Sequence, residues 1–148
     1  MMTISTRGRY ALRLMIDLAQ HNTGEYIALK DICKRQQISM KYLEQIVSQL
    51  GKSGFLKSAR GAQGGYQLAK APEEYTIGSI LRQTEGGLAP VSCLKDQPNQ
   101  CPRYQECLSV PFWEGLYRTI NEYMEGCTLA DLAEEKKSES PEIPVYFL

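Results

Sequence analysis

Side chains that commonly build enzyme active sites are scarce in this chain of 148 residues. It contains a single histidine, no nucleophile placed beside a base, and no glycine-rich loop of the kind that binds phosphates. We therefore expect that the protein is not an enzyme.

Long apolar runs are absent as well. No run approaches the roughly 18 residues that span a bilayer, and the opening MMTISTRGRYALRLMIDLAQ has arginines within its apolar part and no small-residue cleavage site. We expect no signal peptide and no contact with a membrane. The expected location is the cytoplasm, where thiols stay reduced.

The formal net charge is zero, but the basic and acidic residues are segregated along the chain. Residues 1–70 carry eleven lysines and arginines against four acidic residues, whereas residues 71–148 carry six against thirteen. A basic half attracts phosphates and an acidic half is repelled by them, so this pattern is typical of a protein that binds nucleic acid in one orientation. Ordinary solvated surfaces are the alternative explanation.

The five cysteines are unevenly distributed. Cys93, Cys101 and Cys107 lie in one short segment, which is too local to join distant parts of a fold by disulfides. Loops of seven and five residues separate them, so three thiolates can converge on one soft metal centre. A zinc site, although tight C-x2-4-C pairs are absent, and a reversible thiol switch are the alternatives. Cys33 and Cys127 fall on predicted helical segments and are expected to be small buried apolar residues.

Apolar spacing predicts a mainly α fold. We expect helices over about 7–20, 29–36 and 40–51, and two short strands over 55–58 and 66–68 joined by a turn with three glycines. The third helix is capped by Ser39, and its apolar stripe consists of Met40, Leu43, Ile46, Val47 and Leu50. A further helix starts after Thr76 and ends before Gly86. Three helices followed by a glycine-rich hairpin is the order of the winged helix-turn-helix domain.

The rest of the chain is expected to bind a ligand and a second copy. Residues 88–111 show no periodic pattern, and a loop of that length is usually functional or disordered. The next helix carries a broad apolar face made of Phe112, Trp113, Leu116, Ile120, Tyr123 and Met124. We expect this long C-terminal helix to form a two-fold homodimer, with packing against the first helix as the alternative. The expected segments are a winged-helix domain (1–84), a cluster-binding loop (85–111), a dimerisation helix (112–126), and a short helix with a tail (127–148).

The outer face of the third helix carries side chains that can read bases. Glu44 can accept from the cytosine amino group, Gln45 can pair with adenine, and Lys41 can reach guanine or phosphate. Ser48 and Gln49 share this face, which begins at Ser39 and is flanked by Tyr42. In this architecture the start of the helix enters the major groove of double-stranded DNA. Any surface helix also has a polar outer face.

The wing and its surroundings add positive charge. Arg60 lies beside Gly61 at the tip of the hairpin, where an arginine suits a narrow minor groove. Arg7, Arg9, Lys52 and Lys57 are expected to contact phosphates. The alternative is that the glycines only make the turn and that Arg60 is solvated.

Up to about residue 135 the chain resembles the IscR/NsrR/CymR family of bacterial winged-helix regulators. The resemblance rests on Arg-Gly-Arg-Tyr-Ala in the first helix, Ile-Ser-Met-Lys-Tyr-Leu-Glu-Gln in the third, Arg-Gly-Ala-Gln-Gly-Gly-Tyr in the wing, and the three cysteines before Phe112-Trp113. It implies a homodimeric transcription factor on a palindromic operator, in which Glu44 matches a glutamate that helps to discriminate bases and Arg60 matches the wing arginine of the family. It also implies that Cys93, Cys101 and Cys107 hold a [2Fe-2S] cluster, because the CymR-like branch, which controls cysteine metabolism, lacks these cysteines.

The fourth cluster ligand departs from the family pattern. IscR-like members place a histidine three residues after the third cysteine, where this chain has Val110, and their first spacer is two residues shorter. NsrR-like members use an acidic residue near the start of the partner's first helix, where this chain has Arg9. Ser109, Glu106, His21, a backbone atom or a small thiol are the candidates that stay open.

We therefore expect a DNA-binding transcriptional regulator, such as a repressor, whose promoter binding is controlled by an iron-sulfur cluster that senses cluster status, redox state or nitric oxide. A thiol-based or cysteine-metabolism repressor of the same fold without a cluster is one alternative. An electron-transfer iron-sulfur protein is another, and it would lack the steep salt dependence of a DNA complex.

Overall fold

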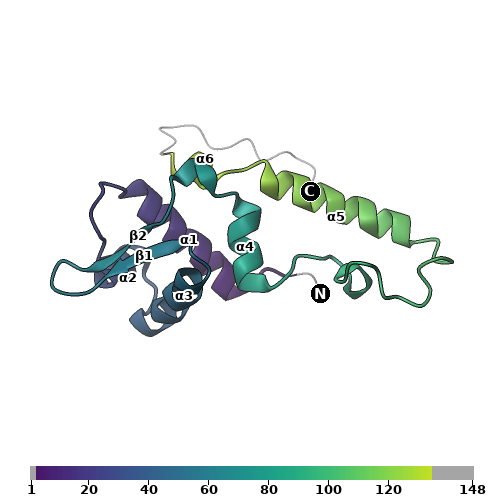
Figure 1. The fold of residues 1–148 in the computed structure, drawn as a ribbon, viewed down its shortest axis with the longest axis horizontal. Coiled ribbons are helices and arrows are strands. Elements are labelled where there is room, and N and C mark those ends of the chain that lie inside the picture. Colours follow the sequence, from purple (N-terminus) through teal and green to yellow (C-terminus); the bar gives the residue numbers. More distant parts are fainter. Residues whose placement is uncertain (1–2, 135–148) are drawn as a thin grey trace.

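The structure, a computed structural model, describes residues 3–134. Its elements follow one another as α1 (Thr6–Gln20), α2 (Leu29–Gln36), α3 (Met40–Lys52), β1 (Leu56–Ala59), β2 (Gly65–Leu68), the 3-10 turn η1 (Pro72–Glu74), α4 (Ile77–Glu85), the 3-10 turn η2 (Ser92–Leu94), α5 (Val110–Glu125) and α6 (Leu129–Ala133). The first three helices and the hairpin form a winged helix-turn-helix body, from which α4 leads to α5 (Figure 1). The predicted mainly α, winged-helix fold is confirmed.

Local capping explains why these helices begin where the sequence predicts. The hydroxyl of Ser39 accepts a hydrogen bond from the Tyr42 amide, and that of Thr76 accepts one from the Ser79 amide. Between α2 and α3, Gln37 adopts a left-handed conformation with φ of 54°, which ends α2 and turns the chain into α3. The turn therefore fixes how α3 is presented.

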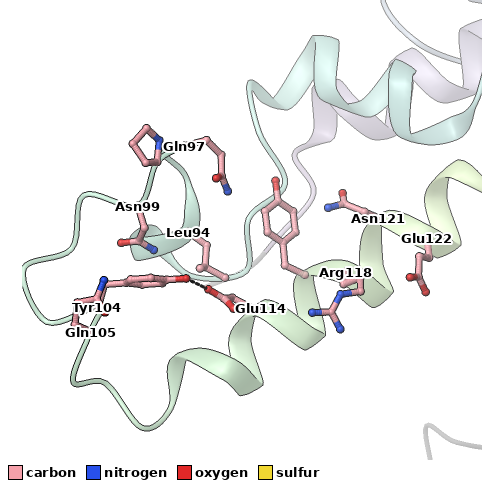
Figure 2. A pocket seen from close by; sticks show the side chains of 11 residues that line it. Leu94, Gln97, Asn99, Tyr104, Gln105, Glu114, Arg118, Asn121 and Glu122 are labelled. Atoms are coloured by element: carbon pink, nitrogen blue, oxygen red, sulfur yellow. Dashed lines mark hydrogen bonds between the residues drawn. The ribbon is translucent and has the colours of Figure 1, made fainter.

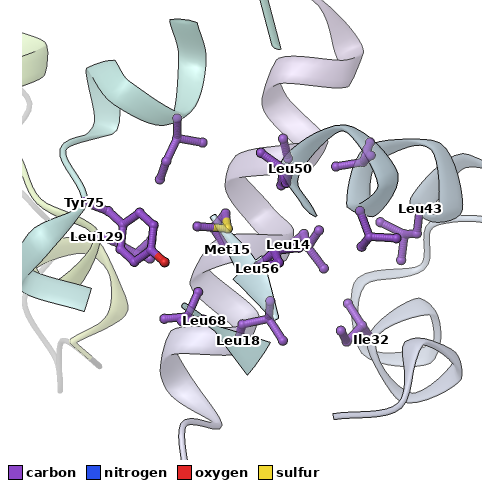
Figure 3. Packing of buried hydrophobic residues seen from close by; sticks show 14 of the residues in the cluster. Leu14, Met15, Leu18, Ile32, Leu43, Leu50, Leu56, Leu68, Tyr75 and Leu129 are labelled. Atoms are coloured by element: carbon purple, nitrogen blue, oxygen red, sulfur yellow. The ribbon is translucent and has the colours of Figure 1, made fainter. Parts of the chain in front are cut away.

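A single apolar core holds the winged-helix body together. It combines the inner faces of α1 and α3 with residues from α2 and both strands, and Tyr75 and Leu129 close it on the side of α4 and α6 (Figure 3). Its fully buried members include Leu14, Met15, Ile32, Leu43, Ile46 and Leu50. The Tyr75 hydroxyl donates to the Phe55 carbonyl at 2.8 Å, so this buried side chain also joins η1 to the start of the wing. The predicted stripe of α3 is confirmed except at Met40, the first residue of the helix, which is 40% exposed.

The wing depends on two close backbone approaches. The strands pair in antiparallel register from Leu56 opposite Leu68 to Ala59 opposite Gly65, one residue later than the sequence predicts for β1, and Ile27 bridges to Tyr66 at the outer edge. A side chain at Gly65 would overlap the Ile27 carbonyl, and one at Gly64 would overlap the Ala59 carbonyl. Gly61 has φ of 103°, a conformation that favours glycine. These glycines are thus required by the shape of the turn.

Helix α5 leaves the body with only its last turns packed. Met124 joins a second apolar cluster with Ile77, Leu81 and Leu88, against which Leu12 of α1 also packs. Arg82 of α4 bonds Asn121 and Glu125 of α5. The alternative that this helix packs against the first helix is therefore only partly correct, because α4 lies between them (Figure 1).

Two further expectations need correction, and one lies outside the described residues. α5 begins at Val110, two residues before the predicted start, because Pro111 suits the first turn of a helix. Cys127 is half-buried in the link between α5 and α6 and not on a helix. The charged and apolar tail from Lys136 onwards is not among the described residues. Within residues 3–134, no helix has both the length and the apolar character that crossing a membrane requires.

One buried carboxylate links α1 to α2. Asp17 is 1% exposed and accepts hydrogen bonds from Nε and Nη2 of Arg35, at 3.0 and 2.7 Å, and from the Gln36 side-chain amide at 2.9 Å. Burial alone raises the pKa of this carboxyl, but the bonds from Arg35 and Gln36 and the charge of Arg35 outweigh it, so the pKa of Asp17 lies below its ordinary value. The ionised form therefore stabilises the fold.

Asp17→Asn should lower the free energy of unfolding by about 2 kcal/mol at neutral pH, because Arg35 and Gln36 lose a charged acceptor. Since the pKa is lowered in the folded state, the contribution is complete above roughly pH 4 and is lost as the pH falls further. Urea unfolding at pH 7 and at pH 3 checks this, with the exposed Glu25→Gln as the control. A deficit of equal size at both pH values would contradict it.

Candidate nucleic-acid interface and cysteine loop

The exposed face of α3 presents most of the predicted base-reading side chains. Lys41, Glu44 and Gln45 are all exposed, and neither Lys41 nor Glu44 forms a salt bridge among the described residues. Ser39 serves as the N-cap at the start of this face. The prediction that Gln49 belongs to the base-reading face needs correction. Its side-chain amide donates to the Gln83 carbonyl at 2.6 Å, and this bond ties α3 to α4.

Tyr42 has a structural contact that the sequence does not reveal. Its ring meets the edge of Tyr10 of α1, with 5.4 Å between the ring centroids. Tyr10 in turn lies beneath the guanidinium of Arg13, which bonds Gln36 of α2. This chain of contacts holds the first turn of α3 against α1 and α2.

The wing lies beside α3 across a shallow groove. The groove encloses about 400 Å³ and is lined by Ser48 and Lys52 of α3 and by Ser58 and Tyr66 of the strands, among others. Arg60, Gly61 and Lys57 are exposed on the hairpin. Arg7 is exposed in the first turn of α1, whereas the Arg9 side chain donates to Thr6. The groove therefore runs between α3 and the strands of the wing, and Lys41, Glu44, Gln45 and Arg60 do not line it.

Asn99 organises the first two cysteines. Its side-chain amide donates to the Cys93 carbonyl at 2.7 Å, and its side-chain oxygen accepts from the Cys101 amide at 2.8 Å. Both cysteines are half-buried, Cys93 within η2 and Cys101 at the start of the following turn. The sequence analysis missed Asn99, although asparagine two residues before a turn often bonds the backbone in this way.

Cys107 lies at the amino-terminal end of α5. Its Sγ is 3.2 Å from the Ser109 Oγ. The hydrogen bond with the Ser109 hydroxyl, followed by bonds with the backbone amides of Ser109 and Val110, lowers the pKa of Cys107, and the charge of Arg103 adds to this. The side chain therefore forms a thiolate, the reactive and metal-binding form, more readily than an ordinary cysteine.

A second contact clasps the cysteine loop onto α5. The Tyr104 hydroxyl donates to Glu114 at 2.7 Å, and this bond raises the pKa of Tyr104. Figure 2 shows the bond at one end of a cleft of about 690 Å³ between the loop and α5, with Arg118 and Glu122 further along the helix. Neither Tyr104 nor Glu114 was singled out from the sequence, because no local pattern indicates a bond across ten residues.

The donors have the right chemistry for an iron-sulfur cluster but are not assembled as ligands. Three thiols lie on one loop and one of them is acidified, which fits soft metal chemistry. In the described part of the chain, however, no three histidine, cysteine or acidic side chains converge as a metal site. The predicted convergence of the three thiols is thus not found among these residues.

Val110, at the family's histidine position, cannot supply a ligand, and one of the candidate fourth ligands, His21, lies far from the cysteine loop of the same chain (Figure 1). Val110 has an apolar side chain that is 8% exposed. His21 caps the end of α1, where its Nδ1 lies 2.8 Å from the Asp17 carbonyl, and it lines a cleft beside Ala62 and Gln63 of the wing. That end of the molecule is remote from the cysteine loop (Figure 1).

The predicted apolar face of α5 is divided. Met124 is buried and Ile120 is half-buried, whereas Phe112 is 66% and Tyr123 is 80% exposed. Near the carboxyl end of the helix, Ile4, Leu88, Ile120 and Met124 line an apolar hollow of about 370 Å³. One protomer therefore leaves part of this helix uncovered.

The chain is similar to known proteins over most of its length. A family model described as "Rrf2: Iron-dependent Transcriptional regulator" matches residues 4–135. Protein rrf2 of Nitratidesulfovibrio vulgaris is 40% identical over 135 residues, which cover 88% of this chain and 87% of that protein.

Solved structures agree in fold. CymR, the global cysteine regulator of B. subtilis, is 40% identical to this chain, with a TM-score of 0.73. The match covers 90% of this chain and 97% of the CymR chain. T. potens IscR is 36% identical, with a TM-score of 0.71 and 93% of each chain covered. The family resemblance and the expectation of a regulator and not an enzyme are thereby confirmed. The chain belongs to the Rrf2 family of transcriptional regulators.

Proposed function

We propose that this regulator binds a palindromic operator as a homodimer and that an iron-sulfur cluster on its cysteine loop controls the binding. The single observation that carries the proposal is the attachment of the loop. Tyr104 clasps the segment that holds three cysteines onto α5, the helix whose uncovered apolar side chains need a partner. A change in the loop therefore acts on the same helix that would set the spacing of two DNA-binding bodies.

The DNA contacts are proposed from side-chain chemistry and exposure. The start of α3, from Ser39 to Gln45, enters the major groove, where Lys41, Glu44 and Gln45 face base edges. Arg60, beside Gly61, enters a narrow minor groove. Arg7 and Lys57 bind phosphates and position the body without specifying sequence. Tyr42 contributes by holding α3 against Tyr10.

The dimer is proposed from the two ends of α5. Two-fold symmetry with antiparallel α5 helices brings the start of one helix beside the end of the other. The exposed Phe112 then lies next to the apolar hollow of the second copy, and Tyr123 is covered as well. Residues 1–84 thus serve as the DNA-binding unit, 85–111 as the sensing loop and 112–126 as the dimerisation helix.

The three thiols are the proposed cluster ligands. A [2Fe-2S] cluster, when bound, supplies an oxidisable centre whose stability responds to iron supply and redox state. Two features of the chain favour binding of the cluster. Asn99 holds Cys93 and Cys101 near one another, and the amides at the start of α5 favour the thiolate of Cys107.

A thiol switch is the second candidate, and one observation favours it. The pKa of the Cys107 thiol is lowered without any metal, so this sulfur is a nucleophile toward oxidants. The two candidates differ in composition, because only the first requires iron and sulfide in protein that is purified without oxygen.

Glu44→Ala and Lys57→Ala should weaken DNA binding in different ways. Glu44→Ala is expected to relax the choice of bases and to lower the affinity for the preferred operator roughly tenfold. Lys57→Ala should weaken binding to all duplexes alike and reduce the slope of log affinity against log salt by about one. Fluorescence anisotropy across a salt series, on an operator selected from random duplexes, measures both. Arg118→Ala on α5 is the control, and equal behaviour of all three variants would contradict the proposed interface.

Replacing any one of Cys93, Cys101 or Cys107 by alanine should remove most of the iron and sulfide from protein prepared without oxygen, because each sulfur is a ligand. Cys33→Ala and Cys127→Ala are matched controls that should keep both elements. Iron and acid-labile sulfide assays with a visible spectrum give the answer. Wild-type protein that lacks iron and sulfide would reject the cluster and leave the thiol switch.

Phe112→Glu and Tyr123→Glu should convert the dimer to a monomer, raising its dissociation constant by at least about 100-fold, since each places a charge in a buried interface. Both side chains are exposed in one protomer, so circular dichroism should show an unchanged fold. Analytical ultracentrifugation measures the association. Leu132→Glu, at an exposed apolar position on α6, is the control, and dimers that survive both α5 substitutions would exclude this interface.

A further inference from the structure

The groove between α3 and the strands of the wing carries hydrogen-bond donors on both sides. On α3, Ser48 and Lys52 are four residues apart and therefore lie on the same side of the helix. On the hairpin, Ser58 lies directly opposite Tyr66 in the antiparallel register, and both residues line the groove. Three side chains with hydroxyl groups and one with an ammonium group thus line a hollow of about 400 Å³, and no acidic residue is among its lining residues.

These donors are not used within the chain. Gln49 and Ser53, at the same end of α3, each donate to a backbone carbonyl. Among residues 3–134, by contrast, no hydrogen bond or salt bridge engages the polar side-chain atoms of the four residues that carry the groove's donors. The Tyr66 ring packs against the apolar core, which restricts where its hydroxyl can lie. The groove therefore presents donors that an acceptor from outside the chain can bind.

Gly51 also lines the groove, and the fold itself does not require a glycine there. The residue lies in the last turn of α3, its backbone is not left-handed, and a Cβ added to it would meet no atom within 4 Å. Glycine weakens a helix relative to alanine. A glycine without a conformational or steric reason inside the protein is typical of a position that a ligand approaches closely.

The place of the groove identifies the ligand. This step rests on the proposed function, in which the start of α3 enters the major groove and Arg60 enters the neighbouring minor groove. One phosphodiester strand separates these two grooves of a duplex, so it passes between the helix and the wing. The hollow lies there, because α3 runs beside β1 (Figure 1).

We propose that the groove binds one phosphate of this strand, with Lys52 as the cation and Gly51 as the point of closest approach. The hydroxyls of Ser48, Ser58 and Tyr66 donate hydrogen bonds to the non-bridging phosphate oxygens. The bound phosphate sets how far α3 and the wing enter their two grooves, and it does so without reading sequence.

Single methylphosphonate linkages, each of which replaces one charged oxygen by a methyl group, locate this phosphate in an operator selected from random duplexes. Anisotropy with wild-type protein should show one linkage in each half-site whose change lowers the affinity at least about tenfold. Tyr66→Phe, which removes only a hydroxyl, should weaken binding to the unmodified operator about fivefold and leave its salt dependence unchanged. On the duplex modified at that linkage, the same variant should lower the affinity less than about twofold, because its partner is already altered.

Gly51→Leu fills the groove from the side of α3. Leucine is a good helix former, so circular dichroism and urea unfolding should show an unchanged fold without loss of stability. Its affinity for the operator should fall at least about tenfold, because the side chain and the phosphate compete for one space. Tyr117→Phe, on α5, is the matched control for loss of a hydroxyl and should bind as the wild type does.

The outcomes separate this inference from the proposed function. Wild-type protein that binds no duplex in a salt-dependent way contradicts the proposed DNA interface and the phosphate site with it. Tight operator binding by the wild type, combined with an effect of Tyr66→Phe that is the same on every modified linkage, overturns only the phosphate site. Wild-type affinity in a folded Gly51→Leu variant overturns it as well.

Discussion

The uncovered apolar side chains of α5 are the constraint from which the rest of the account follows. A helix of this length can bury one stripe against its own domain, and here that stripe is Met124 and Ile120 against α4. Phe112 and Tyr123 then face outward, where they cost free energy in water. In the proposed dimer a second copy removes that cost, and the same helix that joins α4 then also determines how two winged-helix bodies are placed on DNA.

In the proposed function, the cysteine loop adds sensing to this arrangement because of the place where it is attached. Cys107 and Ser109 occupy the amino-terminal end of α5, and Tyr104 holds the loop to Glu114 one turn further along. Arg82 fixes the other end of α5 to α4, which continues from the wing. On this proposal, chemistry at the sulfurs reaches the DNA-binding body through one helix, without a path through the buried core.

The fold could be predicted largely from the sequence because its signals are local. Ser39 and Thr76 mark the starts of their helices, because both are good N-cap residues. The stripe of Leu43, Ile46 and Leu50 has the spacing of a helix buried on one side. The errors arise where the outcome depends on distant contacts. Gln49 is polar and sits among base-reading candidates, yet it is held by the Gln83 carbonyl of another helix. Met40 has the spacing of a core residue but is 40% exposed at the first position of α3.

The site was less predictable for the same reason. The sequence marks the three cysteines, but the contacts that organise them involve Asn99, Tyr104 and Glu114, whose pairing depends on how the loop folds back. The most direct test of the central claim is the affinity of one operator duplex for cluster-bound and cluster-free protein, measured by anisotropy without oxygen. The account predicts at least about a tenfold difference between the two forms. Equal affinities would contradict it.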